Sequence, residues 1–396
     1  MALARLRSSR LRKLVLLALA LLALWRVAPQ AIAKLTGSDF VPYWTAARLF
    51  ITGGDPYSPH QVLKVQTRLP VTHRKRAWMM WNPPWTLSVV GPFGFLALPA
   101  AALSWFLLQF AIVFASSLWL WQLYDGPPQF RWVSILIPGL FLPVDVVLLD
   151  CQMTPLTLLG VVAFLYFVGK HRYKSAGAAL ALLAFKPHLW IPFACVLLLW
   201  CLQERKWQLL ACTGLGFALL ATPVWLRPDL LHHYREIIPT IWDDAAPAWG
   251  GLLRVLFGYQ RVWLQYLPTI PGLAWTILYW RRHRREWDWK EQLPLLLLVG
   301  FLAAPYAWTY DEVVLLPVFI AAATFLLRQK ERRLGWWALG IFVLVNVTMF
   351  ALNLHGSRDE WYIWNVPVWL LAYTLIRYHS APVALPLESG GGVARV

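Results

Sequence analysis

Long apolar runs recur along the whole chain, and they restrict its fold more than any other feature. Only 14% of the 396 residues are charged and 59% are hydrophobic, whereas roughly a quarter of a soluble domain is charged. The pattern predicts an all-α polytopic membrane protein with about twelve transmembrane helices. The expected crossings are residues 12–29, 101–124, 132–149, 154–169, 175–186, 189–203, 207–225, 263–280, 292–307, 311–327, 335–353 and 361–376.

Basic residues gather between these runs. Loops rich in Lys and Arg remain on the cytoplasmic side of a membrane, so these clusters and both chain ends are expected there. The same bias accounts for the formal charge of +17 through contact with anionic membrane lipids, and we do not expect nucleic-acid binding. The clusters are the N-terminal tail, residues 170–174, 205–206, 281–290 and 328–333, and Arg377.

The first apolar run, Leu14–Val27, has two interpretations. Basic residues precede it and Ala31-Ile32-Ala33 follows it, a pattern that also fits a cleaved signal peptide. Cleavage would leave Asp39 close to a free N-terminus and poorly anchored. We therefore interpret the run as a retained first helix.

The chain is expected to form one transmembrane domain over residues 1–380, with a disordered tail at 381–396. A long first extracytoplasmic loop, residues 31–100, should carry interfacial helices, and a second large loop should span 226–262. This topology requires that the segment 85–98, interrupted by Gly91, Pro92 and Gly94, does not cross the membrane. Most Asp, His and Tyr residues outside the basic loops then lie on the extracytoplasmic face.

Short motifs follow one another on that face. Asp39 opens the first loop, Gly53-Gly54-Asp55-Pro56-Tyr57 and Asn82-Pro83-Pro84 follow, Asp150 and Gln152 flank a short turn, and Lys186-Pro187-His188 ends a helix. In order and spacing they resemble glycosyltransferase family 87, a member of the GT-C superfamily. The resemblance implies a GT-C-like fold and transfer of a sugar, mannose in characterised members, from a polyprenyl-phosphate donor.

The resemblance has two departures. Cys151 stands before Gln152 where the family often has Gly. Trp308-Thr309-Tyr310-Asp311 stands in the late loop where the family tends to carry His after Trp. A role for a late histidine is therefore not expected here.

The resemblance implies that Asp39 is the general base and that the anomeric carbon is inverted, since an acceptor hydroxyl must lose a proton during the transfer. An acidic residue at the mouth of a membrane-embedded chain is also costly to desolvate and usually has a specific role. The alternative is an N-cap of the helix that follows, a position at which Asp is favoured.

Lys186 and His188 are the candidates for binding the donor phosphate. Lys186 lies between apolar neighbours, and a lysine there needs an anionic partner. The alternatives are a lysine that extends to the membrane interface and an ordinary interfacial histidine.

A further set of residues is expected to contact the substrates. For each, a structural role is the alternative: turn formation at Asp55 and Tyr57, a solvated turn at Asp150 and Gln152, and an interfacial aromatic belt at Tyr306 and Trp308. No metal site and no cofactor are expected, although His232 and His233 share a loop with Asp243 and Asp244. The expected substrate-binding residues are Tyr43, Asp55, Tyr57, Asp150, Gln152, Tyr306, Trp308 and Asp311.

The apolar runs predict an integral, multi-pass protein of a bacterial cell membrane, and the resemblance implies that it is a glycosyltransferase with its site on the extracytoplasmic side. Its partners would be a polyprenyl-phosphate sugar, a glycolipid or glycan acceptor, and membrane lipids. A transporter or lipid flippase is the alternative, because it would share the number of helices and the buried charges. Transporters usually show inverted halves and charged or broken helices at the middle of the bilayer. Here the acidic residues gather at one face, and the two halves of the chain show no obvious correspondence.

Overall fold

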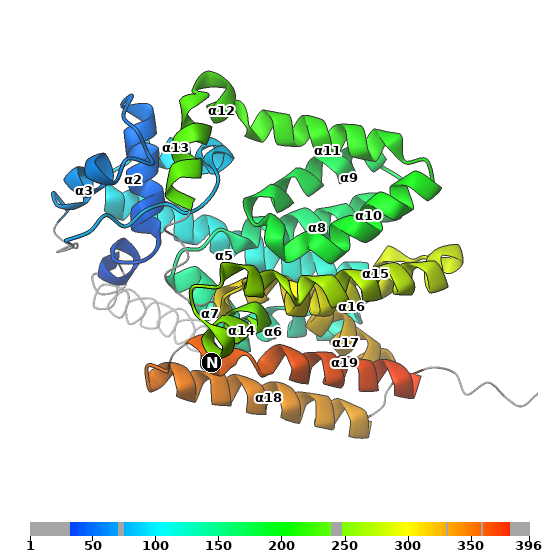
Figure 1. Ribbon diagram of the computed structural model, residues 1–396. Helices are drawn as coiled ribbons and strands as arrows, with labels where there is room; N and C mark the ends of the chain where they lie inside the picture. Colours follow the sequence, from blue (N-terminus) through cyan, green and yellow to red (C-terminus); the bar gives the residue numbers. More distant parts are fainter. Residues whose placement is uncertain (1–31, 70–74, 239–247, 330–331, 358, 381–396) are drawn as a thin grey trace, which may run out of the picture.

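The computed structural model describes residues 32–69, 75–238, 248–329, 332–357 and 359–380, and all regular secondary structure in these ranges is helical. Most of the longer helices lie side by side in one bundle, while α2, α3 and α13 form a smaller group at one end of it (Figure 1). The helices of the bundle are α5 (Leu98–Leu123), α6 (Val133–Leu140), α7 (Leu142–Leu149), α8 (Thr154–Gly169), α9 (Tyr173–Leu180), α10 (Ile191–Gln203), α11 (Trp207–Leu220), α15 (Thr269–His283), α16 (Trp289–Ala303), α17 (Leu316–Gln329), α18 (Arg332–Leu354) and α19 (Asn365–Ser380).

The remaining helices are short and belong to the loops. They are α2 (Phe40–Ile51), α3 (Pro59–Gln66), α4 (Leu87–Val90), α12 (Thr222–Leu226), α13 (Asp229–Ile237) and α14 (Trp249–Phe257), with 3-10 turns that include η1 (Pro84–Thr86), η2 (Gly91–Phe95), η4 (Ala181–Phe185), η5 (Pro187–Trp190), η7 (Val262–Tyr266) and η9 (Thr309–Leu315).

The structure does not show the expected number of about twelve crossings. Within the described residues, three helices are long and apolar enough to span a membrane: Leu98–Leu123, Thr309–Gln329 and Arg332–Leu354. A fourth span results if α6 and α7, bent by 61° at their junction, count as one. Other apolar helices are too short to span the bilayer straight: the 16 residues of α8 reach about 24 Å, against a hydrocarbon core of roughly 30 Å. The chain is a multi-pass membrane protein, and the expected crossing 12–29 and the tail 381–396 lie outside the described residues.

The segment 85–98 folds against α2 and contains no helix long enough to cross. Trp44 donates its indole N–H to the carbonyl oxygen of Leu96 at 2.9 Å, and Arg48 Nη1 donates to the carbonyl oxygen of Gly94 at 3.0 Å. A Cβ atom at Gly94 would lie 2.7 Å from the backbone carbon of Ala47, so only glycine permits this close approach. The segment therefore belongs to the first loop.

The basic loops come together at the end of the bundle opposite to α2 and α3 (Figure 1). Asp125 is paired with Lys290, and its Oδ2 lies 3.9 Å from Arg328 Nη1. Gln203, at the end of α10, donates to the carbonyl oxygen of Arg284 at 3.2 Å. Loops far apart in the sequence thus share one end of the bundle, as the distribution of basic residues predicted.

Candidate active site

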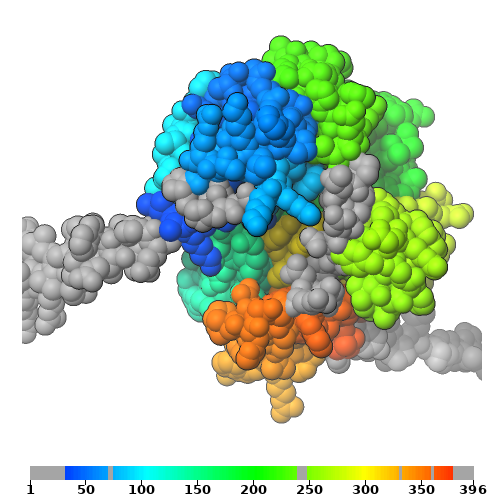
Figure 2. Space-filling view, turned by 60° about the vertical axis from the view of Figure 1, so that its left-hand side comes forward, coloured from blue at the N-terminus to red at the C-terminus, as the bar shows by residue number. Residues whose placement is uncertain are grey.

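A cavity of about 1080 Å³ opens at the end of the bundle that carries α2 and α13. Figure 2 shows this end: blue residues of α2 and α3, green residues of α12 and α13, yellow-green residues near α14 and orange residues between α18 and α19 surround a central hollow. Seven of the residues predicted for the site line the cavity: Asp39, Tyr43, Gln152, Lys186, His188, Tyr306 and Trp308.

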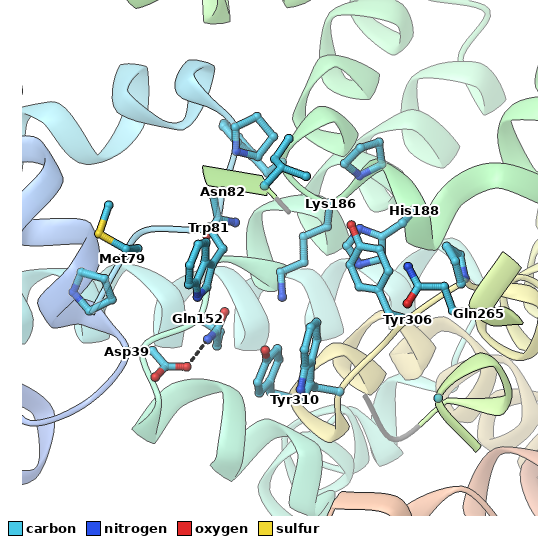
Figure 3. Close-up of a pocket in the computed structure, with 18 of the residues that line it drawn as sticks. Asp39, Met79, Trp81, Asn82, Gln152, Lys186, His188, Gln265, Tyr306 and Tyr310 are labelled. Carbon is cyan, nitrogen blue, oxygen red and sulfur yellow. Dashed lines mark hydrogen bonds between the residues drawn. The ribbon is translucent and has the colours of Figure 1, made fainter. Parts of the chain in front are cut away.

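Asp39 occupies the N-cap position of α2 but does not cap the helix with its side chain. Its carboxylate is turned toward Gln152, whose Nε2 donates to Asp39 Oδ2 at 2.5 Å (Figure 3). The next residue, Phe40, is fully buried and stacks on Trp105 with ring centroids 5.7 Å apart. This packing fixes the start of α2, so the cavity wall holds Asp39 in place and the capping role proposed as an alternative is not observed.

Gln152 connects Asp39 with Tyr43. The Tyr43 hydroxyl donates to Gln152 Oε1 at 2.9 Å, and Trp105 Nε1 donates to the carbonyl oxygen of Cys151 at 2.8 Å. Burial, together with the nearby Asp39 carboxylate, raises the pKa of Tyr43 well above its usual value. Tyr43 therefore stays a neutral donor, which orients the amide of Gln152 so that its NH₂ faces the carboxylate.

Lys186 projects into the middle of the cavity (Figure 3). Its side chain is almost fully buried, and Nζ lies 2.5 Å from Asp311 Oδ1 and 4.4 Å from the ring centre of Tyr310. Asp311 also accepts from the Thr154 hydroxyl at 2.7 Å and from the backbone N–H of Trp308 at 3.1 Å. Asp311 is completely buried and does not line the cavity. Its position is that of a fixed anionic partner for Lys186.

His188 and Tyr306 form one side of the cavity. Their rings stack with centroids 3.9 Å apart, and Tyr306 packs against Trp308 at 5.8 Å. Burial raises the pKa of Tyr306, so its hydroxyl stays protonated at neutral pH. Flat aromatic faces with a hydroxyl and an indole N–H at their edges are suited to the ring and hydroxyl groups of a sugar.

Asp55, Tyr57 and Asp150 do not line the cavity. Asp55 accepts from the backbone N–H of Tyr57 at 2.9 Å and pairs with His233 of α13 at 3.0 Å. The buried Tyr57 donates its hydroxyl to the carbonyl oxygen of Asn82 at 2.9 Å, and Asn82 is in the cavity wall. Asp55 and Tyr57 thus stabilise the cavity wall from behind and do not contact the cavity. Asp150 ends α7.

One charged residue of the cavity was not predicted from the sequence. Arg254 lies in α14, is only 2% exposed, and lines the cavity. Its Nε donates to the carbonyl oxygen of Tyr259 at 3.0 Å and its Nη1 to Gln265 Oε1 at 3.3 Å. Its local sequence carries little signal, because an arginine on a short amphipathic helix usually faces solvent or lipid headgroups.

The histidines considered for a metal have other contacts. His232 pairs with Glu236 at 3.1 Å, and His233 pairs with Asp55. Asp243 and Asp244 lie outside the described residues. Within the described part of the chain, no three His, Cys, Asp or Glu side chains are grouped to hold a metal ion.

The cavity combines a carboxylate, a buried ammonium group and aromatic walls, which is a suitable set for moving a sugar from a phosphate to a hydroxyl group. The sequence profile of glycosyltransferase family 87 matches residues 80–314, a range that contains Gln152, Lys186, Arg254 and Asp311 and begins after Asp39. No curated protein and no solved structure matches the chain. Family membership implies transferase activity, which argues against the transporter alternative. Since the profile covers more than half of its residues, the chain belongs to glycosyltransferase family 87.

Proposed function

We propose that the protein transfers a hexose from a polyprenyl-phosphate donor to a hydroxyl group of a lipid or glycan acceptor, with inversion at the anomeric carbon. Mannose is the hexose that we favour, because the characterised members of the family use it. The observation that supports this proposal best is that Asp39 and Lys186 line the same cavity, although 147 positions separate them in the sequence.

Asp39 acts as the general base in this proposal. The acceptor hydroxyl gives its proton to the carboxylate, its oxygen bonds to the anomeric carbon, and the bond from that carbon to the phosphate oxygen breaks. Gln152 holds one carboxylate oxygen at 2.5 Å, which keeps the carboxylate in place in the cavity wall. One carboxylate is sufficient, because inversion requires no covalent sugar–enzyme intermediate.

Lys186 stabilises the leaving phosphate. A protonated lysine has three N–H donors, and its contacts in the described chain are Asp311 and the face of Tyr310. At least one N–H group of Lys186 thus remains for a phosphate oxygen. Asp311 is the counter-ion of Lys186 and holds its side chain in one position, so the ammonium group is in place before the donor lipid binds.

We infer the side of the membrane from the basic loops. These loops lie at the end of the bundle opposite to α2, whose residues Pro42 and Tyr43 line the cavity. Basic loops are characteristic of the cytoplasmic side. The cavity then opens on the extracytoplasmic side of the membrane. A lipid-linked donor and a glycolipid acceptor can both reach it from the outer leaflet, and the proposed step uses neither a metal ion nor a cofactor.

The test is a transfer assay with purified protein, radiolabelled polyprenyl-phosphate mannose and candidate acceptor lipids, with glucose and arabinose donors in parallel. Asp39→Asn should abolish transfer while expression and the elution profile in detergent stay unchanged. Asp125→Asn is the matched control, because Asp125 is exposed at the opposite end of the bundle and its loss should leave the rate unaltered. Transfer that survives Asp39→Asn would refute the role of Asp39, and uptake of lipid without transfer would favour a flippase.

A further inference from the structure

Arg254 is a second cation in the cavity wall, and it lies on the side away from Asp39. In Figure 3, Asp39 is at one side of the cavity, Lys186 in the middle, and Gln265 beyond Tyr306 on the other side. Arg254 Nη1 is 3.3 Å from Gln265 Oε1, so the guanidinium belongs to that far side. The cavity thus has the order carboxylate, ammonium, guanidinium.

The close packing of α14 fixes this position. A Cβ atom at Gly250 would lie 2.3 Å from the backbone oxygen of Gln265 and 2.7 Å from that of Pro305. Only glycine permits that approach, and Arg254 lies one helical turn later on the same face. The carbonyl oxygen of Tyr259 and the amide oxygen of Gln265 then hold two of its nitrogens. The guanidinium is therefore preorganised.

Inversion restricts where the leaving group can lie. The acceptor oxygen attacks from the Asp39 side, and the phosphate must depart from the opposite face of the anomeric carbon. The phosphate of a bound donor is accordingly on the side of the sugar where Lys186 and Arg254 lie. A guanidinium group is suited to this place, because its planar fork matches two phosphate oxygens at once.

We propose that Arg254 is a catalytic residue that binds the leaving phosphate together with Lys186, an inference that rests on the function proposed above. As the bond to the anomeric carbon breaks, the electron pair stays on the phosphate oxygen. The donor phosphodiester carries one negative charge and the released polyprenyl phosphate carries two, while the acceptor proton is on Asp39. Arg254 thus binds the departing group more strongly than the intact donor, and this difference lowers the barrier.

The test measures turnover, the KM values of donor and acceptor, and inhibition by polyprenyl phosphate. Arg254→Gln should reduce turnover by about 100-fold with a much smaller change in the donor KM, and it should weaken inhibition by polyprenyl phosphate. Arg254→Lys should keep more activity than Arg254→Gln, and added guanidinium ion should restore part of the activity of Arg254→Ala. Arg261→Gln is the matched control, because Arg261 is exposed in the next loop and does not line the cavity.

Two results would overturn the inference. One is an Arg254→Gln protein as active as Arg261→Gln. The other is a loss confined to the acceptor KM with unchanged inhibition by polyprenyl phosphate, which would place Arg254 at the acceptor. If Arg254→Gln does not fold, Arg254→Lys and its inhibition by polyprenyl phosphate decide the question. Failure of the proposed function is distinguishable, because wild-type protein would then transfer no sugar from any polyprenyl phosphate.

Discussion

Replacing Asp311 with Asn tests whether Asp311 serves Lys186, as the geometry indicates, or contacts the sugar. The carboxylate is 0% exposed and receives hydrogen bonds from Lys186, Thr154 and the backbone of Trp308. All three are donors. An Asn side chain keeps one acceptor oxygen and places an NH₂ group where the second was, so one donor loses its partner and Lys186 loses its counter-ion.

The expected loss of stability is large. Removing one member of a buried ion pair typically costs about 3–5 kcal/mol, because the remaining charge is left without compensation in a medium of low polarity. Lys186 is only 5% exposed, so water relieves little of this cost. Removing both charges should be far less damaging, since a buried pair replaced by neutral side chains is often neutral in stability. The double variant Lys186→Met/Asp311→Asn should therefore regain most of what Asp311→Asn loses.

The assay is a double-mutant cycle on unfolding midpoints in detergent, with transfer activity measured on the same samples. A coupling energy above about 2 kcal/mol between the two positions is expected, and all three variants should lose transfer. The double variant is then stable but inactive, which separates the structural role of the pair from the catalytic role of the ammonium. If Asp311→Asn changes stability by less than about 0.5 kcal/mol, or if the two effects add, the ion pair does not act as described.

Two further predictions concern the groups around the cavity. Gly250→Ala should lower the free energy of unfolding by about 1–3 kcal/mol and displace α14, because its new methyl group would meet the backbone oxygens of Gln265 and Pro305. An unchanged free energy of unfolding and an unchanged turnover would contradict the close approach. Glu312 Oε1 accepts from Asn365 Nδ2 at 2.7 Å, whereas Glu312 Oε2 and Asn365 Oδ1 are buried without partners among the described residues. A proton on Glu312 Oε2 would make this atom a hydrogen-bond donor, as the NH₂ group of Gln is. Glu312→Gln should therefore keep the free energy of unfolding, and Glu312→Ala should lower it by about 1–3 kcal/mol. A loss in the Gln variant as large as in the Ala variant would argue against the proton.

The helices that the sequence predicted most accurately are those whose ends are marked by polar or helix-breaking residues. The expected crossing 154–169 has the bounds of α8, which begins beside Pro155 and ends before Lys170. The number of crossings stays a prediction, because hydropathy does not register a bend such as the one between α6 and α7. The hydropathy of a run also does not specify whether its helix is long enough to reach the far surface.

Contacts between residues far apart in the chain were harder to predict than the helices. The sequence indicated that Lys186 needs an anion, and it placed Asp311 near the site, but it did not pair them, since 125 positions separate the two residues. The pairing depends on how η9 meets the break between η4 and η5. Asp55 and Tyr57 form a strong turn motif, and among the described residues this turn is connected to the cavity wall through Asn82 and α13.

Lys186 and Arg254 show which kind of site residue a single sequence discloses. Lys186 stands alone in an apolar run, so its charge is conspicuous and calls for a partner. Arg254 lies in a short helix of mixed polarity, where a basic residue is ordinary. The burial of Arg254 arises because Gly250 contacts Gln265 and Pro305. These two residues follow Arg254 in the chain by about 11 and 51 positions. A cation that becomes part of a site through backbone packing leaves no mark in the local pattern, so residues of this kind are found from the structure.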